Sequence, residues 1–494
     1  MLDYTDCDAT ALAEHVARGD VQPAELVERA IRAIEDVNPG LNAVVHRMYD
    51  QARELAQSPQ PGPFCGVPIV VKDFDGYVSG VPFTASCRFL EGFVPRHDSE
   101  AIARLRRAGF IFLAKTNCPE LALLGTTEPA WRGVTRNPYW LERSPGGSSG
   151  GSAALVAARA VPLAHGGDGG GSLRIPASHC GLVGLKPTRG RVPVAPDHGE
   201  GWGGYIQWGV LTRSLRDTAA VFDVMAGPYP GDPYATPPLP GPLSAELGRD
   251  PGSLRIAFFC GSLYGRETHA EHADAVQRTA AKLTQLGHHV EEARPSFDRE
   301  ALVRAYLTQV SVSTAAEIEE FAALIGRTPQ PELFEPTTWF MNQVGRSQSA
   351  LELNAARETV HAAGRALAEF HTRYDLFMCP TVTHPPVRVG QTAHNTAARL
   401  GLAVLRKLPV GPALLVSLAQ LGAEAMELTP NTQLFNQTGQ PAISLPLAFS
   451  RDGLPIGVQL AAAFGREDLL MRVASQLEAE EPWHARRPPI CAMP

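Results

Sequence analysis

Two clusters of glycine and serine are the segments of this sequence whose composition is best suited to chemistry. The first (residues 146–152) is Gly-Gly-Ser-Ser-Gly-Gly-Ser, and the second (residues 166–172) is Gly-Gly-Asp-Gly-Gly-Gly-Ser. Glycine lets backbone N–H groups converge on one point, because no Cβ blocks unusual backbone angles. Such convergence suits either a phosphate or the oxyanion of an acyl-transfer reaction.

A phosphate site is poorly supported by the rest of the chain. The sequence has no G-x-x-x-x-G-K-[ST] motif. A G-x-G-x-x-G pattern occurs at Gly199, Gly201 and Gly204, but it follows Pro196-Asp-His and not a strand. Dinucleotide binding requires a strand before the glycines and a helix after them. The pattern therefore argues against a nucleotide cofactor.

Ser148 lies in a G-x-S-x-G pattern, which is typical of the nucleophile elbow of α/β-hydrolases. That interpretation requires a strand directly before the serine, and residues 141–145 (Leu-Glu-Arg-Ser-Pro) do not predict one. It also requires a later histidine, for which His371, His384 and His394 are available.

Both clusters are also compatible with tight turns and helix caps, because serine is a good N-cap residue. One further residue favours chemistry. Only five of the 44 basic residues are lysine, and one of them, Lys72, directly follows the apolar run 67–71. A buried lysine can lose its proton at accessible pH, whereas arginine cannot.

Composition excludes several classes of function. The formal net charge is −7 and no basic run occurs, which argues against nucleic-acid partners. No apolar run approaches the roughly 20 residues that span a bilayer, so no membrane association is expected. The N-terminus does not resemble a signal peptide, and the eight cysteines form no C-x-x-C pair. These features predict a cytoplasmic protein with reduced thiols.

Alternating strands and helices predict an α/β fold. Helices are expected at residues 9–37 (two helices), 99–108, 152–160, 213–226, 273–286 and 467–480. Strands are expected at 67–71, 110–114, 161–164, 254–260 and 375–379, and the apolar segments 442–447 and 457–461 are expected to complete the fold. The apolar stretch 400–424 is expected to line a pocket.

The segment 146–192 closely resembles the signature of the amidase signature family. Four flanking segments agree with it: 66–74 (GVPIVVKDF), 113–121 (LAKTNCPEL), 209–215 (GVLTRSL) and 435–448 (FNQTGQPAISLPLA). The resemblance covers essentially the whole chain. It implies one amidase domain over residues 1–494, with a central, mostly mixed β-sheet covered on both faces by helices.

Within that domain the sequence suggests four parts. They are an N-terminal helical part (1–62), a signature core (63–227), a Pro/Gly-rich connection (228–252) and a C-terminal part (253–494) with a helical insertion at about 299–372.

The resemblance implies a catalytic triad of Ser172 as nucleophile, Ser148 as the bridging serine held by a cis peptide bond, and Lys72. It also implies that the backbone N–H groups of Gly169, Gly170, Gly171 and Ser172 hold the oxyanion, and that no metal or cofactor takes part. The usual T-D-x-G-G-S is here Gly-Asp-Gly-Gly-Gly-Ser, with glycine at 167 and 169. Asp168 and Arg174 are expected to organise this loop by ion pairing, and Lys115, Asn117 and Lys186 are expected to be structural.

In the implied mechanism, burial keeps Lys72 neutral so that it can accept the proton of Ser148, which in turn takes that of Ser172. Ser172 attacks the amide carbonyl, Ser148 protonates the leaving amine, and water cleaves the acyl-enzyme. Removing one oxyanion donor typically costs about 100- to 1,000-fold in rate.

The version GGDGGGSLRIPA of the second cluster most resembles the branch of 6-aminohexanoate-cyclic-dimer hydrolases. Three alternatives stay open. They are the glutaminase A subunit of a tRNA-dependent amidotransferase, an aryl acylamidase or esterase of the same family, and a non-catalytic interaction protein. The expected partner is a small-molecule amide, and a homodimer is left open.

Overall fold

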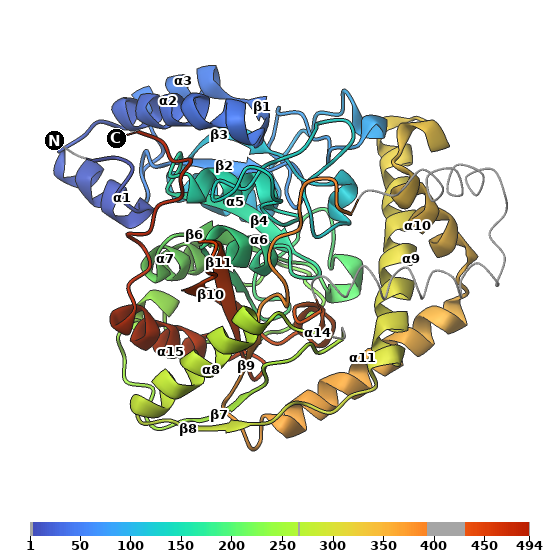
Figure 1. Ribbon diagram of the computed structural model, residues 1–494. Coiled ribbons are helices and arrows are strands. Elements are labelled where there is room, and N and C mark those ends of the chain that lie inside the picture. The colour runs from blue at the N-terminus through green and yellow to red at the C-terminus, as the bar shows by residue number, and fades with distance from the viewer. Residues whose placement is uncertain (1–2, 265–266, 393–429, 494) are drawn as a thin grey trace.

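The computed structural model describes residues 3–264, 267–392 and 430–493. Within these residues, eleven strands form one sheet (Figure 1). In chain order the strands are β1 (Val44–Arg47), β2 (Pro68–Lys72), β3 (Ile111–Thr116), β4 (Leu163–Asp168), β5 (Val183–Lys186), β6 (Gln207–Thr212), β7 (Arg255–Phe258), β8 (His289–Glu292), β9 (Leu376–Pro380), β10 (Ala442–Phe449) and β11 (Pro455–Ala462). Across the sheet their order is β1-β3-β2-β4-β6-β5-β10-β11-β9-β7-β8.

The sheet is mixed. β3, β2 and β4 are parallel neighbours, as are β9, β7 and β8, whereas the strands from β4 through β6, β5, β10 and β11 to β9 pair antiparallel. β2 lies inside a parallel region, and all five of its residues, Pro-Ile-Val-Val-Lys, are buried. A continuous run of β-branched residues suits such a strand, because both of its faces are covered.

The helices cover both faces of this sheet. They are α1 (Ala9–Arg18), α2 (Pro23–Leu41), α3 (Tyr49–Gln57), α4 (Glu100–Arg107), α5 (Gly150–Ala157), α6 (Arg174–Cys180), α7 (Leu215–Met225), α8 (Ala270–Gln285), α9 (Arg299–Ile325), α10 (Pro336–Ser347), α11 (Ala350–Phe370), α14 (Gln433–Thr438) and α15 (Glu467–Glu480). The expected fold class, with its mixed sheet between layers of helices, is therefore confirmed.

Strand β5 shows how the two faces are divided. Val183 and Leu185 belong to an apolar cluster that includes side chains of α7, α8 and α15. Gly184 faces the opposite side, where a Cβ would lie 2.8 Å from both the Ala177 side chain of α6 and the Leu173 carbonyl. Glycine at this position lets α6 approach the sheet closely, and α6 is buried along its whole length.

Residues 299–372 are largely helical, as the sequence predicts. They form α9, α10 and α11, which lie together at one side of the molecule (Figure 1). α9 packs beside the short 3₁₀ helix Trp202–Gly204, and α11 packs beside α14. This helical layer therefore borders the 3₁₀ helix at residues 202–204 and the segment after residue 430.

The sequence predicts a strand only at residues 161–164, but β4 begins at Leu163 and continues through Gly166 and Gly167 to Asp168. Glycine has a low intrinsic preference for β-strands. Here the glycines are needed for close packing, because a Cβ at 166 would lie 2.7 Å from Ser149 Oγ. A Cβ at 167 would lie 2.6 Å from both carboxylate oxygens of Asp75.

Other differences are smaller or concern missed elements. The helix expected at 152–160 is shifted to Gly150–Ala157, whereas α15 has the expected bounds. β1 and β8 are short edge strands with partly exposed residues, and the sequence does not predict them. Nor does it predict β5, β6, α3 or α6. In the Pro/Gly-rich connection, the buried side chain of Glu246 pairs with Arg472, so this segment packs against α15.

No helix in the described part of the chain is long and apolar enough to cross a membrane. The apolar stretch 400–424, expected to line a pocket, lies outside the described residues, as does His394.

The α9–α10 contact allows a stability test with a matched control. A Cβ at Gly345 of α10 would lie 2.9 Å from the Val312 amide nitrogen, whereas a Cβ at Gly364 of α11 meets nothing within 4 Å. Alanine gains the same helix propensity at both positions, so this gain cancels between the variants. Gly345→Ala should be less stable than Gly364→Ala by about 1–3 kcal/mol, the usual cost of overpacking.

Urea unfolding followed by fluorescence measures both variants. Equal free energies of unfolding for the two variants would show that α10 can move away from α9 without a loss of stability.

Candidate active site

The structure joins two of the three predicted catalytic residues directly. Lys72 is the last residue of β2 and is 1% exposed, and Ser148 is fully buried just before α5. Lys72 Nζ donates a hydrogen bond to Ser148 Oγ at 2.8 Å. The Gly147–Ser148 peptide bond is cis.

Ser172 lies beside this pair at the end of the second glycine–serine cluster. Its carbonyl accepts a hydrogen bond from the N–H of Ser149 at 3.3 Å, which places the two serine segments next to each other. Ser172 is half-buried, and its hydroxyl makes no hydrogen bond to any residue that the structure describes. A hydroxyl without a protein partner is available to a substrate.

The backbone donors of the second cluster are not equivalent. The N–H of Gly171 donates to Asp168 Oδ1 at 2.7 Å. The N–H groups of Gly169, Gly170 and Ser172 make no hydrogen bond within the described ranges. Of the four expected oxyanion donors, three are therefore free and the fourth is already used by Asp168.

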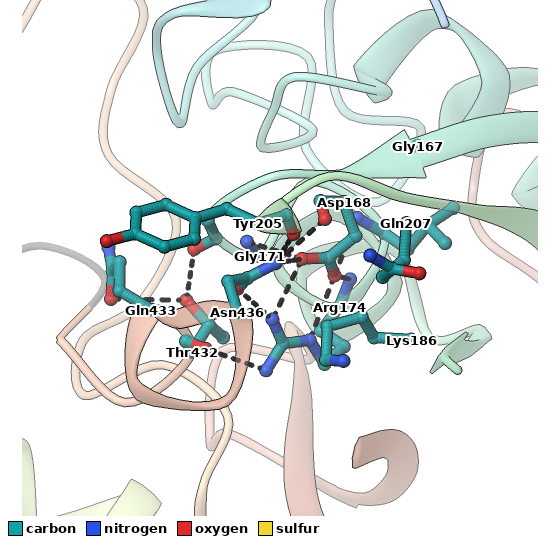
Figure 2. A network of polar contacts seen from close by, with 12 residues as sticks. Gly167, Asp168, Gly171, Arg174, Lys186, Tyr205, Gln207, Thr432, Gln433 and Asn436 are labelled. Atoms are coloured by element: carbon teal, nitrogen blue, oxygen red, sulfur yellow. Dashed lines mark hydrogen bonds and ion pairs between the residues drawn. The ribbon is translucent and has the colours of Figure 1, made fainter. Parts of the chain in front are cut away.

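Asp168 and Arg174 form the predicted ion pair, which is fully buried (Figure 2). Arg174 Nη2 donates to Asp168 Oδ1 at 2.8 Å, and Arg174 Nε donates to Asp168 Oδ2 at 2.9 Å. Asn436 Nδ2 donates to the same carboxylate at 2.8 Å. Burial alone would raise the pKa of Asp168, but the Arg174 charge and these hydrogen bonds lower it to about 2. The carboxylate is therefore charged throughout the physiological range.

Arg174 also ties the second cluster to the C-terminal part of the chain. It donates to the Thr432 carbonyl at 2.9 Å, to Asn436 Oδ1 at 2.6 Å and to Gln459 Oε1 at 2.7 Å. Figure 2 shows Asp168 and Arg174 facing Thr432 and Asn436 across this network. The C-terminal part thus supplies the polar partners that hold the loop before Ser172.

Side chains from other segments occupy the space that a side chain in the glycine loop would need. A Cβ at 169 would lie 3.0 Å from the Trp202 ring, a Cβ at 170 would overlap the Tyr306 hydroxyl, and a Cβ at 171 would lie 2.7 Å from the Thr432 Cβ. At position 169, which the signature leaves open, any other residue would need Trp202 to shift by a few tenths of an ångström.

Trp202 connects this loop to a carboxyl group on α9. Its Nε1 donates to Glu317 Oε1 at 3.1 Å. Burial raises the pKa of Glu317 to about 8. The sequence predicts no role for either residue, although Trp202 lies within the G-x-G-x-x-G pattern at residues 199–204.

The sequence also does not predict a carboxylate beside Lys72. Lys72 Nζ donates to Asp75 Oδ2, and the side chains of both residues are almost completely buried. The sequence predicts burial as the influence on Lys72, whereas the structure also places a buried carboxylate against it. The available signal was a second acidic residue three positions after the lysine, in Lys-Asp-Phe-Asp.

The three residues that the sequence predicts to be structural make no hydrogen bond to Lys72, Ser148 or Ser172 among the described residues. Lys115 lies 3.8 Å from Asp73 and donates to the Gly76 carbonyl, Lys186 donates to the Pro187 carbonyl at 2.7 Å, and Asn117 donates to Thr135. The sequence context of His272, near the start of a predicted helix, suggests a solvated position, but the structure buries this side chain. In the residues described, no group of three histidine, cysteine or acidic side chains is placed to hold a metal ion.

The chain is similar to known amidases over most of its length. The family model described as Amidase matches residues 25–471. A 6-aminohexanoate-cyclic-dimer hydrolase from Pseudomonas sp. (strain NK87) is 40% identical over 494 residues, covering 98% of this chain and 96% of the relative.

Solved structures of amidases are also similar to this chain. A 6-aminohexanoate cyclic dimer hydrolase complexed with substrate is 38% identical with a TM-score of 0.89, and the match covers 99% of this chain and 100% of that one. A bacterial aryl acylamidase is 26% identical with a TM-score of 0.84, and the match covers 99% of each chain.

The buried ion pair makes a prediction about stability. Arg174→Met would leave the Asp168 charge buried without its counter-ion, so it should lower the free energy of unfolding by about 3–5 kcal/mol. In the double variant Asp168→Asn/Arg174→Met the uncompensated charge is gone, so the double variant should be more stable than Arg174→Met alone. Urea unfolding measures both.

In the wild type the lowered pKa of Asp168 stabilises the folded protein at pH values above 3.8, the usual pKa of this group. This stabilisation is lost as the pH falls through about 2. A double variant no more stable than Arg174→Met at neutral pH would show that the loss comes from packing and not from charge.

Proposed function

The chain belongs to the amidase family and is a hydrolase of carbon–nitrogen amide bonds, and on this premise we propose that Lys72, Ser148 and Ser172 are its catalytic triad. The observation that carries the proposal is the buried hydrogen bond from Lys72 to Ser148, next to a glycine loop with free N–H groups. The half-buried hydroxyl of Ser172 at the end of that loop is the proposed nucleophile.

In the proposed reaction, Ser172 Oγ attacks the carbonyl carbon of the amide. The Ser172 proton moves to Ser148 Oγ as the Ser148 proton moves to Lys72 Nζ. The N–H groups of Gly169, Gly170 and Ser172 are the proposed donors to the oxyanion. The proton then returns through Ser148 to the leaving nitrogen, the C–N bond breaks, and water hydrolyses the Ser172 ester.

We propose a cyclic amide related to the 6-aminohexanoate dimer as the substrate. Support comes from 40% identity to a relative of that name over almost the whole chain, and from the glycine-rich version of the second cluster. An aryl acylamidase activity is the second candidate, because a structure of that description matches 99% of the chain. A glutaminase subunit is less well supported, because that group usually carries T-D-T-G-G-S and this sequence has glycine in place of both threonines.

We propose that the enzyme acts in the cytoplasm. All eight cysteines are free in the structure, which suits a reducing compartment. Light scattering of the purified protein would decide between a monomer and the homodimer that the sequence leaves open.

The triad is tested by trapping the acyl-enzyme. Ser172→Ala should abolish the mass increase that a slowly hydrolysed ester substrate leaves on the protein, because no nucleophile remains. Ser148→Ala and Lys72→Met should keep the nucleophile but slow its acylation by about 10²- to 10⁴-fold, the usual contribution of general acid–base catalysis. Intact-protein mass spectrometry measures all three, with the exposed Ser253→Ala as control.

Loss of the adduct in Ser148→Ala together with its retention in Ser172→Ala would make Ser148 the nucleophile and overturn the assignment.

The substrate is tested with a panel of cyclic and linear 6-aminohexanoate dimers, an anilide, a primary amide and glutamine. The cyclic dimer should be opened to the linear dimer, with the product followed by chromatography. Absence of turnover of the cyclic dimer would end the narrow assignment and leave the amidase assignment intact. A clear preference for the anilide would favour the aryl acylamidase candidate instead.

A further inference from the structure

We propose that Asp75 is a positioning residue that holds a proton on behalf of Lys72, so that the buried Lys72–Asp75 pair is neutral before attack and the positive charge it gains on attack is balanced by the oxyanion. The inference rests on the proposed function, because it concerns the proton that leaves Ser172. It extends the proton path from Ser172, Ser148 and Lys72 to a fourth residue.

The geometry places Lys72 between its two partners. Its Nζ donates to Ser148 Oγ at 2.8 Å and also to Asp75 Oδ2. The side chains of Lys72 and Asp75 are 1% and 4% exposed, so bulk water does not separate them. A proton that reaches Lys72 from Ser148 therefore has a carboxylate within hydrogen-bond reach.

The surrounding structure leaves space for this carboxylate. Asp75 has a φ of 65°, in the left-handed region that aspartate tolerates better than most residues. A Cβ at position 167 would lie 2.6 Å from both of its carboxylate oxygens. Threonine, the residue usual at this place in the signature, would therefore collide with Asp75. The glycine at 167 and the acid at 75 fit together as a pair.

The proton steps balance without exchange with solvent. Before attack the pair consists of an ammonium group on Lys72 and a carboxylate on Asp75. Lys72 gives one proton to Asp75: an N–H bond breaks, an O–H bond forms, and a neutral amine results. Lys72 then takes the Ser148 proton, and Ser148 takes the Ser172 proton, as Ser172 Oγ bonds to the carbonyl carbon. Reversal of these steps delivers the proton through Ser148 to the leaving amine.

The burial of the pair favours the internal transfer. A buried ion pair loses much of its Coulomb energy to desolvation, which brings the neutral amine–acid form closer to it in free energy. Without Asp75, a neutral Lys72 requires the release of a proton to solvent. This difference can be measured as a change in the dependence of rate on pH.

Other titratable groups face this pair from neighbouring elements: Asp73, Lys115, Cys118, His165 and Glu317. Burial lowers the pKa of His165 to about 3 and raises that of Cys118 to about 12, so neither titrates near neutral pH. Burial also raises the pKa of Asp73 and lowers that of Lys115, and these two groups lie 3.8 Å from each other. Burial raises the pKa of Glu317 to about 8, so Glu317 can titrate within the range of an assay.

The test is the pH profile of acyl-enzyme formation in Asp75→Asn, which keeps the shape of the side chain and removes its charge. In the wild type the active form, a neutral amine beside a protonated carboxyl group, holds as many protons as the ion pair. Activity should therefore fall only when acid adds a further proton to the pair. In Asp75→Asn, Lys72 must first lose its proton to solvent. The acidic limb should therefore move to higher pH, with a rate that falls about tenfold for each pH unit below it.

A shift of the limb to lower pH would overturn the proposal, because it would mean that Asp75 only stabilises the ammonium form. An unmoved limb would also overturn it. Glu317→Gln serves as control: its limb should remain where the wild type has it, so that a shift in Asp75→Asn is not assigned to Glu317.

A second variant guards against a failure of Asp75→Asn to fold. Gly167→Ala should push the Asp75 carboxylate away from Lys72 and move the acidic limb in the same direction. Combining the two substitutions should give no larger shift than Asp75→Asn alone. If Ser172→Ala still forms the acyl-enzyme, the triad itself is wrong; an intact triad with an unmoved limb refutes only the role of Asp75.

Discussion

Arg174 is the side chain on which the rest of the site depends. It is fully buried, and a guanidinium is always charged, so its place in the interior requires partners for its donors. It finds them in Asp168, directly before the glycine loop, and in Asn436 and Gln459 of the C-terminal part. One charge thus fixes the glycine loop relative to α14 and β11. The loop can be built from glycine, with little rigidity of its own, because this network holds it.

The glycines of the loop are explained by what surrounds them. Four segments that are distant in sequence each place a side chain where a Cβ would otherwise lie, namely Asp75 at Gly167, Trp202 at Gly169, Tyr306 at Gly170 and Thr432 at Gly171. At position 167 the sequence has glycine where the signature usually has threonine, and it also has glycine at position 169, which the signature leaves open. In the structure these two glycines allow close contact with Asp75 and Trp202.

Local patterns were enough to predict the elements that have strong periodicity and burial. β2 and α15 follow from an apolar run and a clear helical pattern, and the Asp168–Arg174 pair follows from the signature. The sequence does not predict β8, because this strand is short and exposed at a sheet edge and depends on β7 for its pairing. The extension of β4 through Gly166 was missed for a related reason: contacts from distant segments override the low strand preference of glycine.

The contrast between local motifs and contacts from distant segments also explains why the reaction can be identified more readily than the substrate. The groups proposed to break the amide bond lie in β2, around α5 and between β4 and α6, where the signature is found. The side chains that touch the glycine loop from outside, Trp202 and Tyr306, come from a 3₁₀ helix and from α9, which lie outside the amidase signature segments. Glu317 accepts a hydrogen bond from Trp202, whose ring lies against the loop. Substitutions in these outer elements leave the proposed triad intact and change the walls around it, so relatives with one chemistry can differ in the amide that they accept.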